Sequence, residues 1–298
     1  MTGPLLDPFV DNPFLVRSLL AGVLVALACA VAGTFVVLRG LAFVADALAH
    51  GVLPGIAIAV LIGAPTVMGA AAGTVVMMGG VSVITRRSRL SSDTAIGLLF
   101  AGMLALGVMI TSRSRTFFGD LTRIFTGEIL GVSDTDLWWQ LAALGAVCAT
   151  AWACRRPFLL LSLDPDLAAT SGFAVRRYEN LLLFVVAVAI LSSFQTVGTL
   201  LVFGMLVAPA STAALVSRRV GVMMLIAAVI GALSVYVGLL LSYHADLAAG
   251  ASIVVVSVGL FLVTLAITEV RRSAQARRER AASPGHVHEH GGGHGHQH

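Results

Sequence analysis

The chain consists of long apolar runs separated by short polar joints. Each run has about the length that an α-helix needs to cross the hydrocarbon of a membrane, roughly 20 residues. The nine runs are 14–38, 41–62, 64–85, 94–112, 135–154, 178–194, 197–216, 220–242 and 250–269. Because backbone polar groups in lipid must be satisfied within the segment itself, the pattern predicts an all-α, polytopic transmembrane bundle. The run 178–194 is the shortest, so eight spans are an alternative to nine.

Composition excludes a soluble domain. Hydrophobic residues make up 58% of the chain and charged residues only 11%, whereas soluble domains carry about 25% charged residues. The basic residues are all arginines, and they occur as small clusters at the ends of apolar runs rather than as a stripe. This distribution argues against nucleic-acid binding and is typical of membrane topology.

The arginine clusters predict the orientation of the chain. If nine helices alternate in direction, most clusters fall on one side, which the positive-inside rule assigns to the cytoplasm. The clusters are Arg86, Arg87 and Arg89; Arg155 and Arg156; Arg176 and Arg177; Arg218 and Arg219; and Arg271, Arg272, Arg277, Arg278 and Arg280. The chain is therefore expected in the plasma (inner) membrane of a bacterium, with its N-terminus outside and its C-terminus in the cytoplasm. The segment 113–134 is basic on the outer side, and it is predicted to be either a loop or a partly embedded helix.

Three regions follow from this topology. Residues 1–13 form an extracytoplasmic N-terminus, 14–269 the transmembrane domain and 270–298 a cytoplasmic tail. The tail has almost no apolar residues with which to form a core, so it is predicted to be disordered.

The second run carries a pair of ionisable residues. Asp46 and His50 are four positions apart, so an α-helix brings their side chains together on one face. Ionisable groups inside a span are costly and usually face a cavity or a transport path. A carboxylate with an imidazole suits zinc, manganese or ferrous iron. The alternatives are a structural Asp–His hydrogen bond and a proton relay.

A proline follows this pair. Pro54 has no amide hydrogen to donate to the carbonyl of His50, so that carbonyl is predicted to be free to line a polar cavity.

Three residues outside this run are secondary candidates for metal contact. His244 and Asp246 lie between the eighth and ninth runs, where the alternative is that they cap a helix or face water, and Glu128 lies near the outer end of the path if 113–134 folds inward. The tail can chelate transition metals through alternating histidines, although a plain solvated tail is the alternative. These are His286, His288, His290, His294, His296 and His298.

The longest interior loop, 155–177, is predicted to contain a short amphipathic helix. Leu160, Leu163, Leu167 and Ala168 recur at helical spacing. The helix is expected to start at Asp164 to Asp166 and to end at Gly172. Such a helix serves either at the lipid surface or as a docking element for a soluble partner.

Common catalytic signatures are absent from the sequence. It contains no GxxxxGK[ST], HExxH or GxSxG, so it is not expected to hydrolyse ATP by itself or to act as a hydrolase of these kinds. The chain is interpreted as a transporter rather than an enzyme.

Ordered sequence blocks resemble the integral-membrane permeases of ABC-type zinc/manganese/iron importers. The blocks span about residues 14–269, and they are VADALAHGVLPGIA, SSDTAIGLLFAGMLALGVMI, IFTGEILGVSDTDLW, LDPDLAATSGF, TVGTLLVFGMLVAPASTAAL and YHADLAAGASIVVVSVGLF. The resemblance implies a fold similar to vitamin B12-type importer permeases. It also implies a homodimer of permeases, two cytoplasmic ATPase subunits and an extracytoplasmic metal-binding protein.

The resemblance gives roles to particular residues. It implies that Asp46 and His50 form the translocation site, with no permanently bound cofactor. It also implies that an ATPase contacts the segment made of Leu163, Asp164, Asp166, Leu167, Ala168 and Gly172. The histidine tail is outside the common pattern.

The sequence therefore predicts ATP-driven import of a divalent transition metal. Zinc is expected first because of the histidine tail, with manganese or ferrous iron as alternatives. Two other hypotheses are a permease for an organic metal chelate and a secondary transporter or channel that acts alone.

Overall fold

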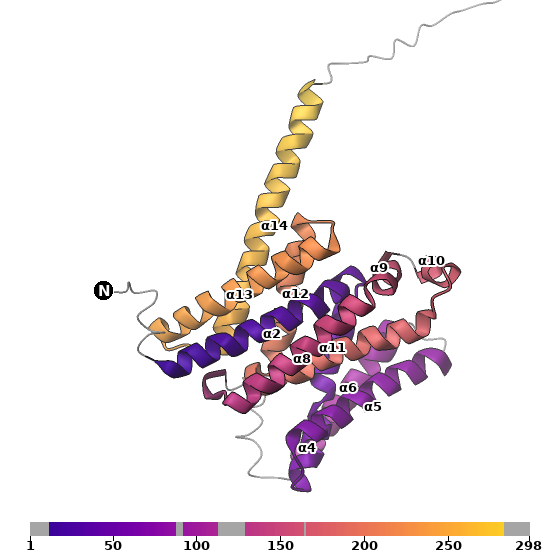
Figure 1. Ribbon diagram of the computed structural model, residues 1–298, viewed down its shortest axis with the longest axis vertical. Helices are drawn as coiled ribbons and strands as arrows, with labels where there is room; N and C mark the ends of the chain where they lie inside the picture. The colour runs from indigo at the N-terminus through magenta and orange to yellow at the C-terminus, as the bar shows by residue number, and fades with distance from the viewer. Residues whose placement is uncertain (1–11, 88–91, 113–128, 164, 283–298) are drawn as a thin grey trace, which may run out of the picture.

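The computed structural model describes residues 12–87, 92–112, 129–163 and 165–282. These residues form helices joined by short turns, without any strand among them (Figure 1). The helices are α2 (Pro13–Leu38), α3 (Ala42–Gly51), α4 (Leu53–Leu61), α5 (Thr66–Arg87), α6 (Ser92–Thr111), η1 (Ile129–Gly131), α8 (Asp134–Ala153), α9 (Arg155–Leu163), α10 (Pro165–Thr170), α11 (Val175–Val197), α12 (Thr199–Val216), α13 (Val220–Ala245) and α14 (Ala249–Ala282).

Every apolar run marked in the sequence coincides with helix, which confirms the prediction of a polytopic helical bundle. Six helical spans of the described chain are long and apolar enough to cross a membrane, and a seventh is added if α8 and α9 form one bent span. Two shorter apolar helices, Thr94–Ile110 and Val202–Val216, occupy the remaining runs. Nine spans is therefore an approximate count.

Tryptophans mark both ends of α8. Trp138 and Trp139 lie in its first turns and Trp152 in its last turn, and each is more than 70% exposed. The separation along the helix is about 20 Å at 1.5 Å per residue. Tryptophan is enriched at membrane–water interfaces, so its presence near both ends of α8 agrees with a helix that crosses the lipid.

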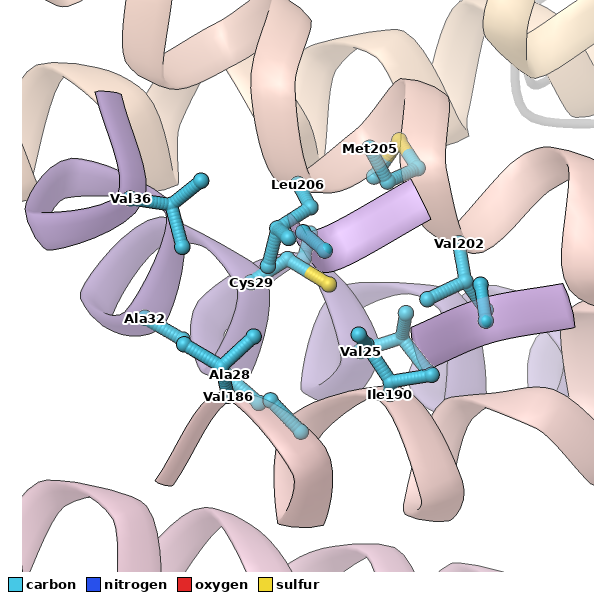
Figure 2. Packing of buried hydrophobic residues seen from close by; sticks show 14 of the residues in the cluster. Val25, Ala28, Cys29, Ala32, Val36, Val186, Ile190, Val202, Met205 and Leu206 are labelled. Atoms are coloured by element: carbon cyan, nitrogen blue, oxygen red, sulfur yellow. The ribbon is translucent and has the colours of Figure 1, made fainter. Parts of the chain in front are cut away.

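Helix α2 lies at the centre of the bundle, where it packs against α8, α11, α12 and α13. Figure 2 shows its small and branched side chains meeting those of α11 and α12. The cluster includes Val25, Ala28, Cys29, Ala32 and Val36 from α2, Val186 and Ile190 from α11, and Val202, Met205 and Leu206 from α12. Small residues along α2 allow the close helix approach on which packing in lipid depends.

The second span is broken. Helix α3 ends at Gly51, Val52 separates it from α4, and Pro54 lies in the first turn of α4. The break follows from the missing amide hydrogen of Pro54. Beyond it, α4 packs directly on α5, because a Cβ atom at Gly55 would collide with the carbonyl oxygen of Gly69.

Several arginine clusters gather at one end of the bundle, which we call the arginine end. Arg39 at the end of α2 pairs with Glu179 near the start of α11, beside Arg176. Leu38 at the end of α2 and Ala214 near the end of α12 pack against the same buried cluster, and Ala214 lies about one helical turn before Arg218 and Arg219. This arrangement agrees with the clustering on one side that the sequence predicts, while the assignment of that side to the cytoplasm stays a prediction.

Two segments differ from the sequence prediction. The loop 155–177 contains two short helices rather than one, because α9 begins directly after α8 and turns away from it by 74°. Helix α14 continues to Ala282, so residues 270–282 are helical where the sequence suggested a disordered tail. This extension is rich in Ala, Arg, Gln and Glu, which favour a helix once α14 has nucleated it.

Candidate metal site

Asp46 and His50 lie together on α3, as the sequence predicts. The distance between Asp46 Oδ1 and His50 Nε2 is 3.6 Å, and the two side chains are 27% and 18% exposed. That distance is too long for a strong hydrogen bond. The pair is therefore close enough to share a ligand without being locked together by a direct bond of its own.

His50 lies near the middle of its span, and Asp46 lies about one helical turn nearer its start. The span Ala42–Leu61 has 20 residues, or about 30 Å at 1.5 Å per residue. His50 is about 12 Å from the first residue of α3 on the same scale, directly before the break at Val52. A carboxylate and an imidazole at this depth have a high desolvation cost unless they meet a polar partner.

The separation of the donor atoms suits a shared cation. Two ligands that each lie about 2.1 Å from one metal are about 3.0–3.4 Å apart for octahedral to tetrahedral angles. The observed 3.6 Å is within a few tenths of an ångström of that range.

Phe100 of α6 supports the imidazole. The rings of His50 and Phe100 meet edge to face, with centroids 5.5 Å apart and planes at 75°. This contact restricts the rotation of the imidazole and covers one side of it. Phe100 was not among the residues predicted from the sequence, where its only signal is that it is the sole aromatic residue of the run 94–112.

The pair occupies the less covered face of α3. Ala47, Leu48 and Gly51, on other sides of the helix, are buried, and Gly51 lies against Met77 of α5. Asp46 and His50 retain exposure by contrast. Metals of this type need at least four ligands, and no group of three or more His, Cys, Asp or Glu residues gathers in the described chain. Asp46 and His50 are therefore two candidate ligands that the described chain brings together here.

The prediction for the carbonyl of His50 needs correction. That carbonyl accepts from the amide of Val52 at the end of α3, so it is not left free to line a cavity. Pro54 has no amide hydrogen to donate to this carbonyl, and the amide of Val52 donates to it instead.

His244 and Asp246 lie at the other end of the bundle, at the C-terminus of α13. His244 Nδ1 is 2.9 Å from the carbonyl oxygen of Leu240. A carbonyl can only accept, so Nδ1 carries the hydrogen, and Nε2 of the neutral imidazole keeps its lone pair. Asp246 ends α13 in a left-handed conformation with φ 50°. Both residues are exposed, and they are separate from the Asp46–His50 pair.

The segment 163–172 lies at the arginine end. Helix α10 includes Asp166, Leu167 and Ala168; Leu167 is 49% exposed, whereas Ala168 is fully buried. Gly172 has φ +83°, which favours glycine, and it follows the end of the helix as predicted. Figure 1 shows α9 and α10 side by side at this end.

The other expected positions lie outside the described part of the chain. These are Glu128, Asp164 and the tail histidines His286, His288, His290, His294, His296 and His298. The backbone of Leu163 ends α9, but its side chain is not described.

The fold is that of a polytopic helical membrane protein. A family model, the ABC 3 transport family, matches residues 11–268, and the chain belongs to this family. It is a membrane permease subunit, which leaves ATP hydrolysis to a separate subunit.

Individual relatives agree with this assignment. The manganese transport system membrane protein MntC of Halalkalibacterium halodurans is 38% identical over 255 residues, which cover 86% of this chain and 87% of the relative. The chelated iron transport system membrane protein YfeD of Yersinia pestis is 32% identical over 265 residues, covering 89% of each. In the solved structure of PsaBC from Streptococcus pneumoniae in complex with Fab, one chain is 31% identical with a TM-score of 0.79. That match covers 89% of this chain and 95% of the other.

Proposed function

We propose that this chain is the permease of an ATP-driven importer of a divalent transition metal. The observation that carries the proposal is the Asp46–His50 pair, whose donor atoms are 3.6 Å apart in a broken helix near mid-membrane. The two side chains hold the cation on its way across, and water or a second permease copy supplies the other ligands. The metal is the cargo and not a resident cofactor.

Manganese or ferrous iron is the proposed cargo ahead of zinc. Relatives at 38% and 32% identity are named for manganese and for chelated iron. The expectation of zinc rested on the tail histidines, which are outside the described chain. One carboxylate and one imidazole bind all three metals, so the donor pair alone does not select among them.

The two ends of the bundle each offer a contact surface for one kind of partner. A pair of cytoplasmic ATPase subunits docks at α10, where Leu167 presents an exposed apolar side chain. An extracytoplasmic metal-binding protein delivers the cargo at the opposite end. There the Nε2 atom of His244, with Asp246, makes the first contact with the cation. The orientation is that of the positive-inside rule, with the arginine end in the cytoplasm.

Transport assays with a reconstituted complex test the proposal. The permease, its ATPase and its binding protein are placed in proteoliposomes, and uptake of radiolabelled manganese, iron and zinc is measured with and without ATP. ATP-dependent uptake of at least one metal is expected, and Asp46→Ala or His50→Ala should reduce it by about 100-fold or more, on the scale at which loss of charged ligands acts. Thr264→Ala in α14, which removes only a hydrogen bond to Leu260 within that helix, should transport normally.

Each alternative has its own result in this assay. Uptake without ATP would indicate a transporter that acts alone. Uptake of an organic metal chelate that is insensitive to both Asp46→Ala and His50→Ala would indicate a chelate permease. Normal metal uptake by both variants at equal expression would overturn the site assignment.

A further inference from the structure

A short ion pair joins the end of α2 to the start of α11. Arg39 Nη2 lies 2.8 Å from Glu179 Oε1, and the arginine side chain is only 12% exposed. Two other pairs are longer and more exposed: Arg17–Asp134 at 3.3 Å and Arg272–Glu269 at 3.5 Å. Exposed pairs contribute little because water screens them, whereas a short, partly buried pair with a direct hydrogen bond couples its two helices more strongly.

The two partners of this pair lie on segments with different roles. Arg39 ends α2, and only Gly40 and Leu41 separate it from α3, which carries Asp46 and His50. Gly40 has φ +65°, a conformation that permits a sharp turn between the two helices. Glu179 lies in the first turns of α11, which follows α10 and Gly172 along the chain.

A second contact holds the same end of α2. Phe35, one turn before Arg39, meets Phe158 of α9 with ring centroids 5.3 Å apart and planes at 71°. Both rings are at most 1% exposed. The end of α2 is therefore held by the helix that precedes α10 and also by the helix that follows it.

Free volume borders the start of α3. A cavity of about 260 Å³ lies beside the ion pair, lined by Leu41 and Val44 near the start of α3 and by Val81, Ser82, Ile96 and Leu183 from the neighbouring helices. Protein interiors are otherwise closely packed and resist displacement. Arg39 and Glu179 line the same cavity, so the ion pair and the first turn of α3 border one loosely packed region.

From this geometry we propose that Arg39 and Glu179 are positioning residues for transport. Displacement of α9 and α10 by the ATPase moves α11 and the end of α2 together. The ion pair passes this displacement through Gly40 to α3, which changes the exposure of Asp46 and His50. The inference rests on the proposed function, because it requires an ATPase docked at α10.

Charge reversal tests the inference in the complete complex in proteoliposomes. The measured quantity is the amount of manganese transported per ATP hydrolysed. Arg39→Glu and Glu179→Arg each place like charges together, and each should lower this ratio about tenfold, within the usual range of coupling between sites. The double variant restores an opposite-charge pair and should return the ratio to within about threefold of wild type, as expected for directly coupled residues.

Two controls separate coupling from folding. Glu269→Arg disrupts the exposed Arg272–Glu269 pair within α14, and it should leave the ratio unchanged. Glu179→Gln keeps a hydrogen-bond acceptor of the same shape but removes the charge, so it should fold normally and lower the ratio by a few fold. If the reversed variants do not fold, Glu179→Gln decides the question.

The outcomes distinguish the two proposals. A wild-type complex that moves no metal, or that retains no ATPase, contradicts the proposed function itself. A wild-type complex that transports normally contradicts only this inference if the folded single variants keep the full ratio. The inference also fails if the folded double variant remains as poorly coupled as the single variants.

Discussion

The imidazole of His50 rests against the edge of Phe100, with ring centroids 5.5 Å apart. His50 belongs to the second span and Phe100 to α6, so this contact ties the orientation of one proposed ligand to a different helix. Side chains that orient a metal ligand commonly affect affinity as much as a weak ligand does.

Removal of the Phe100 ring should therefore weaken the site without destroying it. Phe100→Ala is expected to raise the metal concentration for half-maximal uptake by about tenfold, because the imidazole gains rotational freedom. Phe100→Leu keeps most of the apolar volume and should have a smaller effect. The measurement is initial uptake against metal concentration. An unchanged concentration dependence for Phe100→Ala would show that the ring only fills space.

The contact between α4 and α5 should be intolerant of side chains. Gly55→Val would drive a side chain into the backbone of Gly69, and such overpacking costs roughly 1–3 kcal/mol or more. Lower thermal stability in detergent and reduced uptake are expected. Gly102→Ala in α6 is the matched control, because nothing lies within 4 Å of a Cβ atom there. Equal stability of the two variants would contradict the packing described.

The proposed docking helix makes a prediction about ATPase binding. Leu167→Asp places a charge on the exposed apolar position of α10, so co-purification of the ATPase should fall by about tenfold or more, the scale of an interface anchor. Gly172→Val should act similarly through strain at φ +83°. Replacement of exposed Leu247, which lies at the opposite end of the bundle, by Asp should leave ATPase binding unchanged. Normal retention of the ATPase by Leu167→Asp would instead favour a role for α10 at the lipid surface.

The His244 contact predicts an effect on metal entry rather than on transport capacity. His244→Ala removes the proposed outer ligand, so half-maximal uptake should need a few times more metal while the maximal rate stays the same. His244→Gln keeps a polar side chain of similar length and should be intermediate. Uptake curves with the binding protein at saturation provide the measurement. A loss of maximal rate alone would place His244 in the protein–protein contact instead.

The sequence by itself determined the helices and the main candidate pair. Apolar runs of this length form helices because lipid offers no other partner for the backbone. Asp46 and His50 meet because four residues make slightly more than one turn. The end of the short helix near Gly172 and the interruption of the second span near Pro54 depend only on residues close in sequence. The sequence alone could therefore predict both.

Only the tertiary structure decided which helix faces meet. The Arg39–Glu179 pair, the Phe35–Phe158 contact and the His50–Phe100 contact each join distant segments. Spans such as α12 are apolar nearly all round, so their periodicity does not show which side faces a neighbour. In lipid an outward leucine and an inward leucine both have an apolar environment. The choice between them depends on close packing and on pairing of the few polar groups, which are properties of the whole assembled bundle.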